Sequence, residues 1–349
     1  MTDLKKNYDK LNVHFELWKS ESDAEPFIPE MIQKLKDDGI AYISDGALVV
    51  DVQEETDKHE VPPCLVVKSD GASLYATTDL ATVVMRMKEI NPDSMVYLAD
   101  KRQELHYTQF FRVSRKANFV RPETGLKFIG FGTMNGKDGK PFKTRDGGVM
   151  RLEALIGEVN DAVREKMKER YQDETINEDT VQKVALAAIK YGDLSNQATK
   201  DYNFDIDRFC SFEGNTGPYL LYTIVRIKSI LRKAGVATAE VIDLSAVKKL
   251  LNTSFETISK ESKELKNLLK SLASFPAMIR DAATELAPHK ICGYLFQLSD
   301  AFNSFYHETP ILKEEDETLK EQYMSLITFT LAVLLEGIDL LGFSAPEQM

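Results

Sequence analysis

The 349-residue chain has little cysteine, and the positions of its cysteines exclude a Cys-x-x-Cys site and a zinc site with Cys/His ligands. Its three cysteines, Cys64, Cys210 and Cys292, lie far apart in the sequence and leave an odd count. None belongs to a Cys-x-x-Cys pair or to a Cys/His cluster with the spacing of zinc ligands. We therefore expect buried thiols in a reducing compartment and no metal site made by the protein.

Long apolar runs and net positive charge are also missing. No uninterrupted apolar run reaches the ~18 residues that span a membrane, and the opening "MTDLKKNYDK" has no basic stretch leading into an apolar core. The formal net charge of -11 argues against indiscriminate nucleic-acid binding, because phosphates require a positive surface. We expect a cytoplasmic protein without a membrane partner, whose RNA contacts would be confined to a local basic patch.

The first part of the chain mixes helix and strand signals. Pro29 and Gly39 bracket an amphipathic helix in "IPEMIQKLKDDG". The stretches "AYISDGALVVDV" and "CLVVKSDGASLYAT" each predict a hairpin around an Asp-Gly turn, and the two hairpins could share one sheet. From Thr77 onwards helical and strand patterns alternate, which indicates a parallel sheet with crossover helices.

Beyond Val149 nearly every segment has a helical pattern. The predicted fold class is therefore α/β followed by all-α. A polar stretch, "SNQATKDYNFDIDRF", suggests a second boundary within the helical part. We expect three regions, which are residues 1–150, 151–204 and 205–349.

The loop "GKDGKPFKTRDGG", residues 136–148, gathers cations in an acidic chain. A solvated turn around Asp138-Gly139 is one explanation. The loop also follows a strand ending at Gly132, which places it at the carboxyl edge of the predicted sheet, where open α/β folds bind ligands. Lys140 and Lys143 could close over a polyphosphate and offset its charge, although the Walker pattern GxxxxGK[ST] is absent.

Six blocks of the sequence resemble successive blocks of the arginyl-tRNA synthetases, a family of class I aminoacyl-tRNA synthetases. They are "LNVHFELWKSES", "KSDGASLYATTDLA", "DKRQELHYTQFF", "KPFKTRDGG", "FEGNTGPYLLYTIVRIKSIL" and "LLGFSAPEQM". The resemblance implies a partial Rossmann-like nucleotide-binding domain with a hairpin insertion, followed by a helical anticodon-binding bundle. It also implies ATP-dependent attachment of arginine to an arginine tRNA through arginyl-adenylate, with Mg²⁺ as the counter-ion of ATP, by a monomer.

The resemblance also assigns residues of the catalytic domain. A carboxylate can grip a guanidinium bidentately and a phenol ring can pack against its stem, so the implied arginine-binding residues are Tyr75, Asp79 and Gln103. The implied ATP-binding residues are His106, Gln109, Gly132 and Met134, and the implied catalytic residues are Lys140, Lys143, Thr144 and Arg145. Without the resemblance, Asp79 could simply favour a helix start, and His106 could be a structural histidine.

In the helical part, aromatic and basic residues share one helix face. Aromatics at helical spacing usually belong to a core, but rings beside cations also suit splayed RNA bases. By resemblance, the anticodon-binding candidates are Tyr219, Tyr222, Arg226, Phe302, Tyr306 and Met349.

The family's other signature, a His-x-Gly-His stretch, has no counterpart here. The five histidines are His14, His59, His106, His289 and His307, and none fits the motif. We therefore expect a carboxyl-terminal part of a synthetase that is inactive alone, with apolar surface exposed on an incomplete sheet.

Two other functions stay open on the sequence. A non-catalytic tRNA-binding protein derived from a synthetase would bind tRNA without turning over ATP. An unrelated nucleotide-binding α/β protein with a helical dimerisation domain would bind ATP with no preference for any tRNA.

Overall fold

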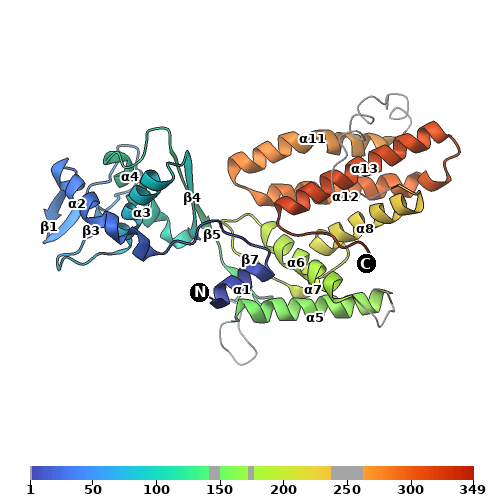
Figure 1. Cartoon of the computed structure of the whole chain (residues 1–349), viewed down its shortest axis with the longest axis horizontal. Coiled ribbons are helices and arrows are strands. Elements are labelled where there is room, and N and C mark those ends of the chain that lie inside the picture. Colours follow the sequence, from blue (N-terminus) through green and yellow to red (C-terminus); the bar gives the residue numbers. More distant parts are fainter. Residues whose placement is uncertain (1, 141–149, 172–176, 237–261) are drawn as a thin grey trace. The chain divides into compact units, whose positions relative to one another are not determined.

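The computed structural model contains two compact units. The smaller unit is Phe15–Thr133, and the larger unit combines Met1–His14 with Met134–Met349. The chain therefore passes from the larger unit into the smaller one and back again (Figure 1). The structure describes residues 2–140, 150–171, 177–236 and 262–349.

The smaller unit begins with the turn η1 (Glu21–Phe27) and the helix α2 (Ile28–Asp37), which carries Pro29 in its first turn as predicted. A three-stranded antiparallel sheet follows, in the order β1 (Ala41–Ser44), β2 (Ala47–Val50) and β3 (Cys64–Val67). The turn between β1 and β2 takes positive φ at both central residues, 50° at Asp45 and 80° at Gly46. This geometry matches the twist of a two-residue hairpin, so the first predicted hairpin is confirmed.

The second predicted hairpin is wrong. Only β3 forms, and residues 68–72 close a turn in which the Lys68 amide donates to the Ala72 carbonyl at 3.1 Å. Helix α3 (Tyr75–Glu89) starts directly afterwards. The Leu74 amide donates to the Thr77 side chain at 2.9 Å, and Leu80 is fully buried, so a capped amphipathic helix outcompetes a second strand.

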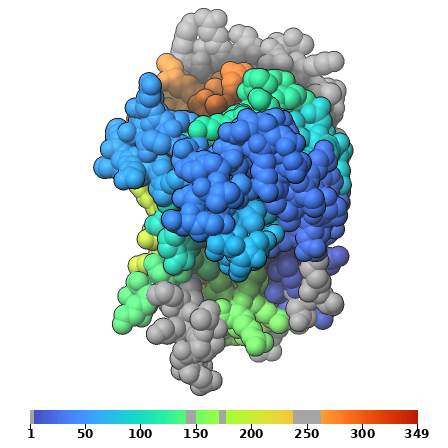
Figure 2. All heavy atoms as spheres, turned by 90° about the vertical axis from the view of Figure 1, so that its left-hand side faces the viewer, coloured from blue at the N-terminus to red at the C-terminus, as the bar shows by residue number. Residues whose placement is uncertain are grey.

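The predicted alternation of helices and strands is confirmed after α3. Strand β4 (Ser94–Asp100) and strand β5 (Gly125–Phe131) pair in parallel over their whole lengths. They are connected by the short turn η2 (Lys101–Gln103) and by helix α4 (Glu104–Lys116). The segments of this unit before β4 are blue and cyan in the space-filling view (Figure 2).

The sheet formed by β4 and β5 has one covered face and one exposed face. Met95 and Tyr97 are buried in the core that contains α3 and α4. On the alternate face Val96, Leu98 and Phe131 are 46%, 67% and 43% exposed. Parallel sheets are normally buried on both faces. The expected exposed apolar surface is therefore present on this sheet.

In its described residues, the larger unit is helical apart from one short parallel pair, β6 (Met134–Asn135) with β7 (Tyr202–Asn203). Figure 1 shows α8, α11, α12 and α13 running alongside one another. Its described helices are α1 (Thr2–Lys10), α5 (Leu152–Tyr171), α6 (Glu178–Leu194), α7 (Ile206–Phe209), α8 (Gly217–Lys233), α11 (Lys263–Glu285), α12 (Pro288–Glu308), η3 (Ile311–Lys313) and α13 (Glu317–Leu340).

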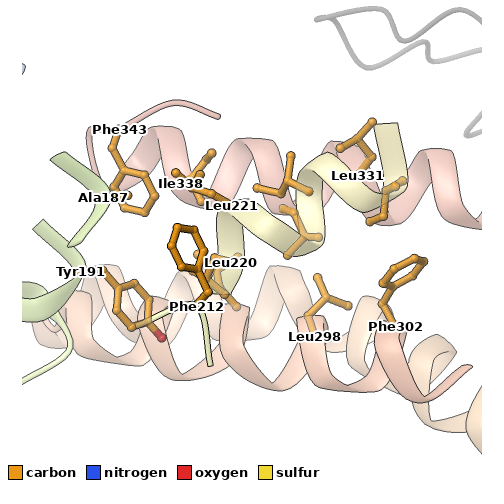
Figure 3. Close-up of a cluster of buried hydrophobic side chains, with 14 of the residues drawn as sticks. Ala187, Tyr191, Phe212, Leu220, Leu221, Leu298, Phe302, Leu331, Ile338 and Phe343 are labelled. Carbon is orange, nitrogen blue, oxygen red and sulfur yellow. The ribbon is translucent and has the colours of Figure 1, made fainter. Parts of the chain in front are cut away.

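Side chains from α6, α8, α12 and α13 form one hydrophobic core, part of which Figure 3 shows around Tyr191, Leu220, Leu298 and Leu331. The Tyr191 hydroxyl donates to the Cys292 carbonyl at 2.8 Å, which satisfies a buried polar group. All three cysteines are buried free thiols, as expected from the sequence. Burial raises the pKa of the Cys64 thiol to about 12.

Helix α13 is long and apolar enough to cross a membrane by length and composition. However, 56% of its most apolar window is buried inside the protein. Leu326, Ile327 and Leu334 on this helix are fully buried in the helical core. Its apolar character is therefore accounted for by packing.

We predict that Leu98→Lys reduces self-association of the chain and changes its free energy of unfolding by less than about 0.5 kcal/mol, because an exposed position loses little packing. Light scattering across a concentration series and chemical denaturation would measure the two effects. Ile43→Lys is the matched control, since Ile43 is 65% exposed on β1 and away from this face. Destabilisation of several kcal/mol by Leu98→Lys, as for a core substitution, would contradict the exposed face.

Candidate functional site

The start of α3 and the start of α4 bring two predicted site residues together. Tyr75 is the first residue of α3 and is 74% exposed, and Asp79 follows one helical turn later. The Asp79 Oδ2 atom lies 2.6 Å from Nε2 of His106, in the first turn of α4. The side chain of Thr77 provides the cap at the start of α3. Asp79 is not that cap, and its partner is His106.

His106 is supported on its other sides by aromatic rings. Its ring centroid lies 5.5 Å from that of Tyr107 and 5.2 Å from that of Phe110, which is fully buried. The side chains of His106 and Asp79 remain 25% and 34% exposed. A carboxylate has about four acceptor positions, so Asp79 can bind His106 and still accept N–H groups from a ligand.

The turn between β4 and α4 carries Gln103, which is exposed and occupies the N-cap position of α4. This turn is held by Arg102, whose side chain donates to both oxygens of Asp100 at 2.8 Å and 2.6 Å. These bonds lower the pKa of Asp100 to about 2, so the pair stays ionised at neutral pH. A side chain at Gly130 would approach the Lys101 Cα atom to 2.7 Å, so the turn requires glycine there.

Gln109 has a structural partner. Its Nε2 atom donates to the Pro62 carbonyl at 2.8 Å. Three residues further along α4, Arg112 binds Asp57 at 2.6 Å. Both contacts attach α4 to the segment that precedes β3. A primary amide has two N–H donors and an acceptor oxygen, so this bond is chemically compatible with an ATP contact through Gln109.

The basic loop is described only up to Lys140, which is exposed. Asp138 and Gly139 form the turn foreseen from the sequence, with φ of 74° at Gly139 and a 2.7 Å bond from the Gly136 amide to the Lys140 carbonyl. Lys137 lies 3.4 Å from Asp205. The other three predicted catalytic residues, Lys143, Thr144 and Arg145, lie outside the described residues.

The remaining two predicted ATP-binding residues follow β5. Gly132 is half-buried and lies within the smaller unit, whereas Met134 begins β6 and belongs to the larger unit. The structure therefore does not bring Met134 together with His106 within one unit.

A second group of predicted residues comes together on α8. Arg226 donates to the Asn303 side-chain oxygen at 2.6 Å and to the Tyr222 hydroxyl at 2.7 Å. The Asn303 amide donates to the hydroxyls of Tyr219 and Thr223, both at 3.0 Å. Asn303, on α12, therefore binds Tyr219 and Arg226 directly, and Arg226 in turn binds Tyr222. Nothing in the sequence pattern indicated Asn303.

The two tyrosines of this group are half-buried, and their pKa values move in opposite directions. Burial raises the pKa of Tyr219. Burial also acts to raise the pKa of Tyr222, but its hydrogen bond with Arg226 and the charges of Arg226 and Arg170 lower it overall. The guanidinium carbons of Arg226 and Arg170 lie 4.7 Å and 4.6 Å from the centre of the Tyr222 ring.

Phe302 is fully buried in the helical core, as Figure 3 shows, which corrects its assignment as a direct anticodon contact. A ring without exposed surface cannot stack on an RNA base. Phe302 instead supports Tyr306, since the two rings are nearly parallel with centroids 6.0 Å apart. Tyr306 is half-buried and remains a candidate.

Met349 is positioned by the segment that follows α13. Lys228, which is 5% exposed on α8, forms an ion pair with Glu347. Lys190 donates to the Gly342 carbonyl at 3.0 Å. These bonds attach the segment to α8 and α6, and Met349 packs half-buried against the helical core.

Within residues 2–140, 150–171, 177–236 and 262–349, no group of three or more His, Cys, Asp or Glu side chains is arranged to hold a metal ion.

Comparison with known proteins identifies both parts of the chain. Residues 1–206 match the family model of the class I (R) tRNA synthetase catalytic domain, and residues 220–349 match that of the DALR anticodon binding domain. The arginine–tRNA ligase of Agathobacter rectalis is 59% identical over 356 aligned residues, which cover 100% of this chain and 58% of that protein. The enzyme of Alkaliphilus oremlandii is 49% identical, and the match again covers 100% of this chain and 58% of that protein. The chain thus spans 58% of the length of these curated relatives.

Solved structures agree with this assignment. The arginyl-tRNA synthetase of Plasmodium falciparum superimposes with a TM-score of 0.81 at 25% identity, over 100% of this chain and 56% of that one. The Thermus thermophilus enzyme shares the fold, with a TM-score of 0.82 at 24% identity, over 99% of this chain and 62% of that one. The expected order of an α/β part followed by a helical anticodon-binding domain is confirmed. Because the catalytic-domain model matches more than half of the sequence, the chain belongs to the arginine-specific class I tRNA synthetases.

Proposed function

We propose that the chain acts in arginine–tRNA ligation, supplying the second part of the catalytic domain and the anticodon-binding bundle. The observation that carries this proposal is the pair of Asp79 and His106 beside the exposed ring of Tyr75. A carboxylate held by a neighbouring histidine, one helical turn from an exposed phenol, suits a ligand with a planar cation on an apolar stem.

In the proposed reaction the carboxylate of arginine attacks the α-phosphate of ATP. Arginyl-adenylate forms and pyrophosphate leaves, and the arginyl group then passes to a hydroxyl of the terminal adenosine of the tRNA. Asp79 accepts N–H groups of the arginine guanidinium, Tyr75 packs against the aliphatic stem, and Gln103 provides a third contact. Such positioning lowers the barrier by removing the entropy cost of aligning the reactants.

His106 contributes to the ATP side of this site, with Gln109, Gly132 and Met134 as further proposed contacts. Mg²⁺ would accompany ATP as its counter-ion. Lys140, Lys143, Thr144 and Arg145 would stabilise negative charge on the phosphates as pyrophosphate leaves. The exposed position of Lys140 after a tight turn supports its part in this role.

The proposed RNA partner is an arginine tRNA, read by Tyr219, Tyr222, Arg226, Tyr306 and Met349. In support of this, the network around Asn303 holds partly exposed aromatic rings next to a guanidinium. Half-exposed rings beside cations provide stacking surfaces for unpaired bases. We expect the protein to act as a monomer in the cytoplasm, without a membrane partner.

We also propose that this chain does not aminoacylate tRNA alone, because the exposed face of the β4–β5 sheet indicates an incomplete nucleotide-binding domain. The same observation favours a second candidate function, a tRNA-binding protein without catalysis. Binding of tRNA without ATP turnover, in a chain shown to be a complete natural product, would favour this second function.

We predict that Asp79→Asn weakens arginine binding by at least about tenfold, because a neutral amide loses a charge-assisted bidentate contact worth about 1.5–3 kcal/mol. Isothermal titration of the chain with arginine measures this change. The matched control is Asp45→Asn, since Asp45 is exposed in the β1–β2 turn and asparagine tolerates its positive φ. Equal arginine affinity of Asp79→Asn and the unmodified chain would remove Asp79 from the pocket.

We predict that the chain binds an arginine tRNA transcript at least about tenfold more tightly than the same transcript with a changed anticodon, since a base stacked on an aromatic ring contributes about 1–3 kcal/mol. Filter binding at one fixed salt concentration measures both affinities. Tyr222→Ala should reduce the difference between the two transcripts. Equal binding of both transcripts by the unmodified chain would contradict anticodon recognition by α8.

A further inference from the structure

The hydrogen bonds between α8 and α12 have a fixed direction, because they begin at a side chain that can only donate. Arg226 donates to the Asn303 side-chain oxygen at 2.6 Å and to the Tyr222 hydroxyl at 2.7 Å. A guanidinium has no acceptor atom, so it decides which way each neighbouring group must point. Asn303 therefore turns its oxygen toward Arg226, and its amide nitrogen points elsewhere.

The amide nitrogen of Asn303 carries this direction on to two residues of α8. It donates to the hydroxyl oxygens of Tyr219 and Thr223, both at 3.0 Å, and a primary amide has two N–H groups for these two bonds. The Thr223 hydroxyl in turn donates to the Tyr219 carbonyl at 3.1 Å. The Tyr219 hydroxyl thus accepts a bond from Asn303 and keeps its own proton for another partner.

The Tyr222 hydroxyl is in the same situation. Its oxygen accepts from Arg226 and also from Arg170, in the last turn of α5. Burial acts to raise the pKa of Tyr222, but these two hydrogen bonds and the charges of the two guanidinium groups lower it overall. A phenol oxygen accepts at most two hydrogen bonds, so the remaining capacity of this hydroxyl is its O–H group.

Among the residues that the structure describes, neither tyrosine hydroxyl donates to an acceptor of the protein, and both side chains are half-buried. We propose that Tyr219 and Tyr222 donate their hydroxyl protons to acceptor atoms on unpaired anticodon bases. Arg226 and Asn303 are the positioning residues that impose this direction. The inference rests on the proposed recognition of an arginine tRNA, and it adds the chemical type of the group that is read.

This direction gives the site a preference among bases. Carbonyl oxygens and ring nitrogens of bases accept a hydroxyl proton, whereas exocyclic amino groups only donate. An amino group facing Tyr222 would meet an oxygen that already accepts two hydrogen bonds, and a donor left unpaired in a contact is costly. A neutral hydroxyl also adds direction without charge, which suits a base edge better than a phosphate. The site therefore favours bases that present a carbonyl oxygen or a ring nitrogen to the two tyrosines.

The test is filter binding of the full chain to an arginine tRNA transcript and to the same transcript with a changed anticodon, at one fixed salt concentration. Tyr219→Phe and Tyr222→Phe keep the rings and remove the donors. Each should weaken binding of the matched transcript by about two- to tenfold, the range of one net hydrogen bond, and should affect the changed transcript less. Tyr42→Phe is the matched control, since Tyr42 is exposed on β1 of the smaller unit, and it should bind like the unmodified chain.

Asn303→Asp reverses the direction of the network without removing it. A carboxylate pairs with Arg226 but cannot donate, so the Tyr219 hydroxyl must give its proton to that carboxylate. Asn303→Asp should therefore weaken binding of the matched transcript about as much as Tyr219→Phe, and combining the two substitutions should give no further loss. Asn267→Asp, at an exposed position of α11, adds the same charge and controls for electrostatic repulsion.

A second measurement tests which partner donates. A fluorinated tyrosine in place of Tyr219 has a more acidic hydroxyl, which donates more strongly and accepts more weakly. At a pH well below the pKa of the fluorinated phenol, this replacement should tighten binding of the matched transcript. Unchanged or weaker binding would show that the Tyr219 hydroxyl does not donate to the RNA, and would overturn the inference.

The outcomes separate this inference from the function on which it rests. If the unmodified chain binds no tRNA, the tRNA-binding function itself fails. If it binds tRNA but Tyr219→Phe, Tyr222→Phe and Tyr42→Phe give equal affinities, only the role of the two hydroxyls is overturned. Equal losses on both transcripts would also overturn it, because the acceptors would then lie on the RNA backbone. Additive losses from Asn303→Asp and Tyr219→Phe would refute the positioning role of Asn303.

Discussion

The arrangement of the larger unit depends on a direct backbone contact between α8 and α6. A Cβ atom at Gly217, in the first turn of α8, would lie 2.2 Å from the Ala187 carbonyl oxygen of α6. No side chain fits at that distance, so glycine allows the start of α8 to rest on the backbone of α6. The contact fixes where α8 begins, and it thereby fixes the positions of Tyr219, Tyr222 and Arg226 along the helix.

The smaller unit depends in a similar way on the pairing of β4 with β5. Their parallel register determines where the strands end, and the turn after β4 then starts α4 beside α3. His106 and Asp79 are 27 positions apart in the sequence, and this packing brings them within 2.6 Å. The contact between Asp79 and His106 therefore depends mainly on how α3 and α4 pack against one small sheet. The residues next to Asp79 and His106 in the sequence matter less.

Local sequence signals predicted the fold well in segments that carry a signal for only one kind of secondary structure. Asp45 and Gly46 specify the first hairpin turn, and the helix–strand alternation gave the parallel pair. The second hairpin failed because the segment after Asp70-Gly71 also carries a helix start, and the burial of Leu80 favours the helix. Asn303 and Arg170 could not be predicted, because each contacts α8 from a distant helix and leaves no periodic signal. Phe302 and Tyr306 lie one turn apart on α12, and only packing decides which of them is buried.

The division of the chain between its units has a consequence for the order of folding during synthesis. The smaller unit is one continuous segment and can fold once it has left the ribosome. The larger unit includes Asn12, whose side chain donates to the Gly342 carbonyl at 3.2 Å, across 330 positions of sequence. That contact can form only after Gly342 has been synthesised, so Asn12 lacks this partner while the intervening residues are made. Such a long-range closure is the kind of step that slows folding and leaves apolar segments in need of protection by chaperones.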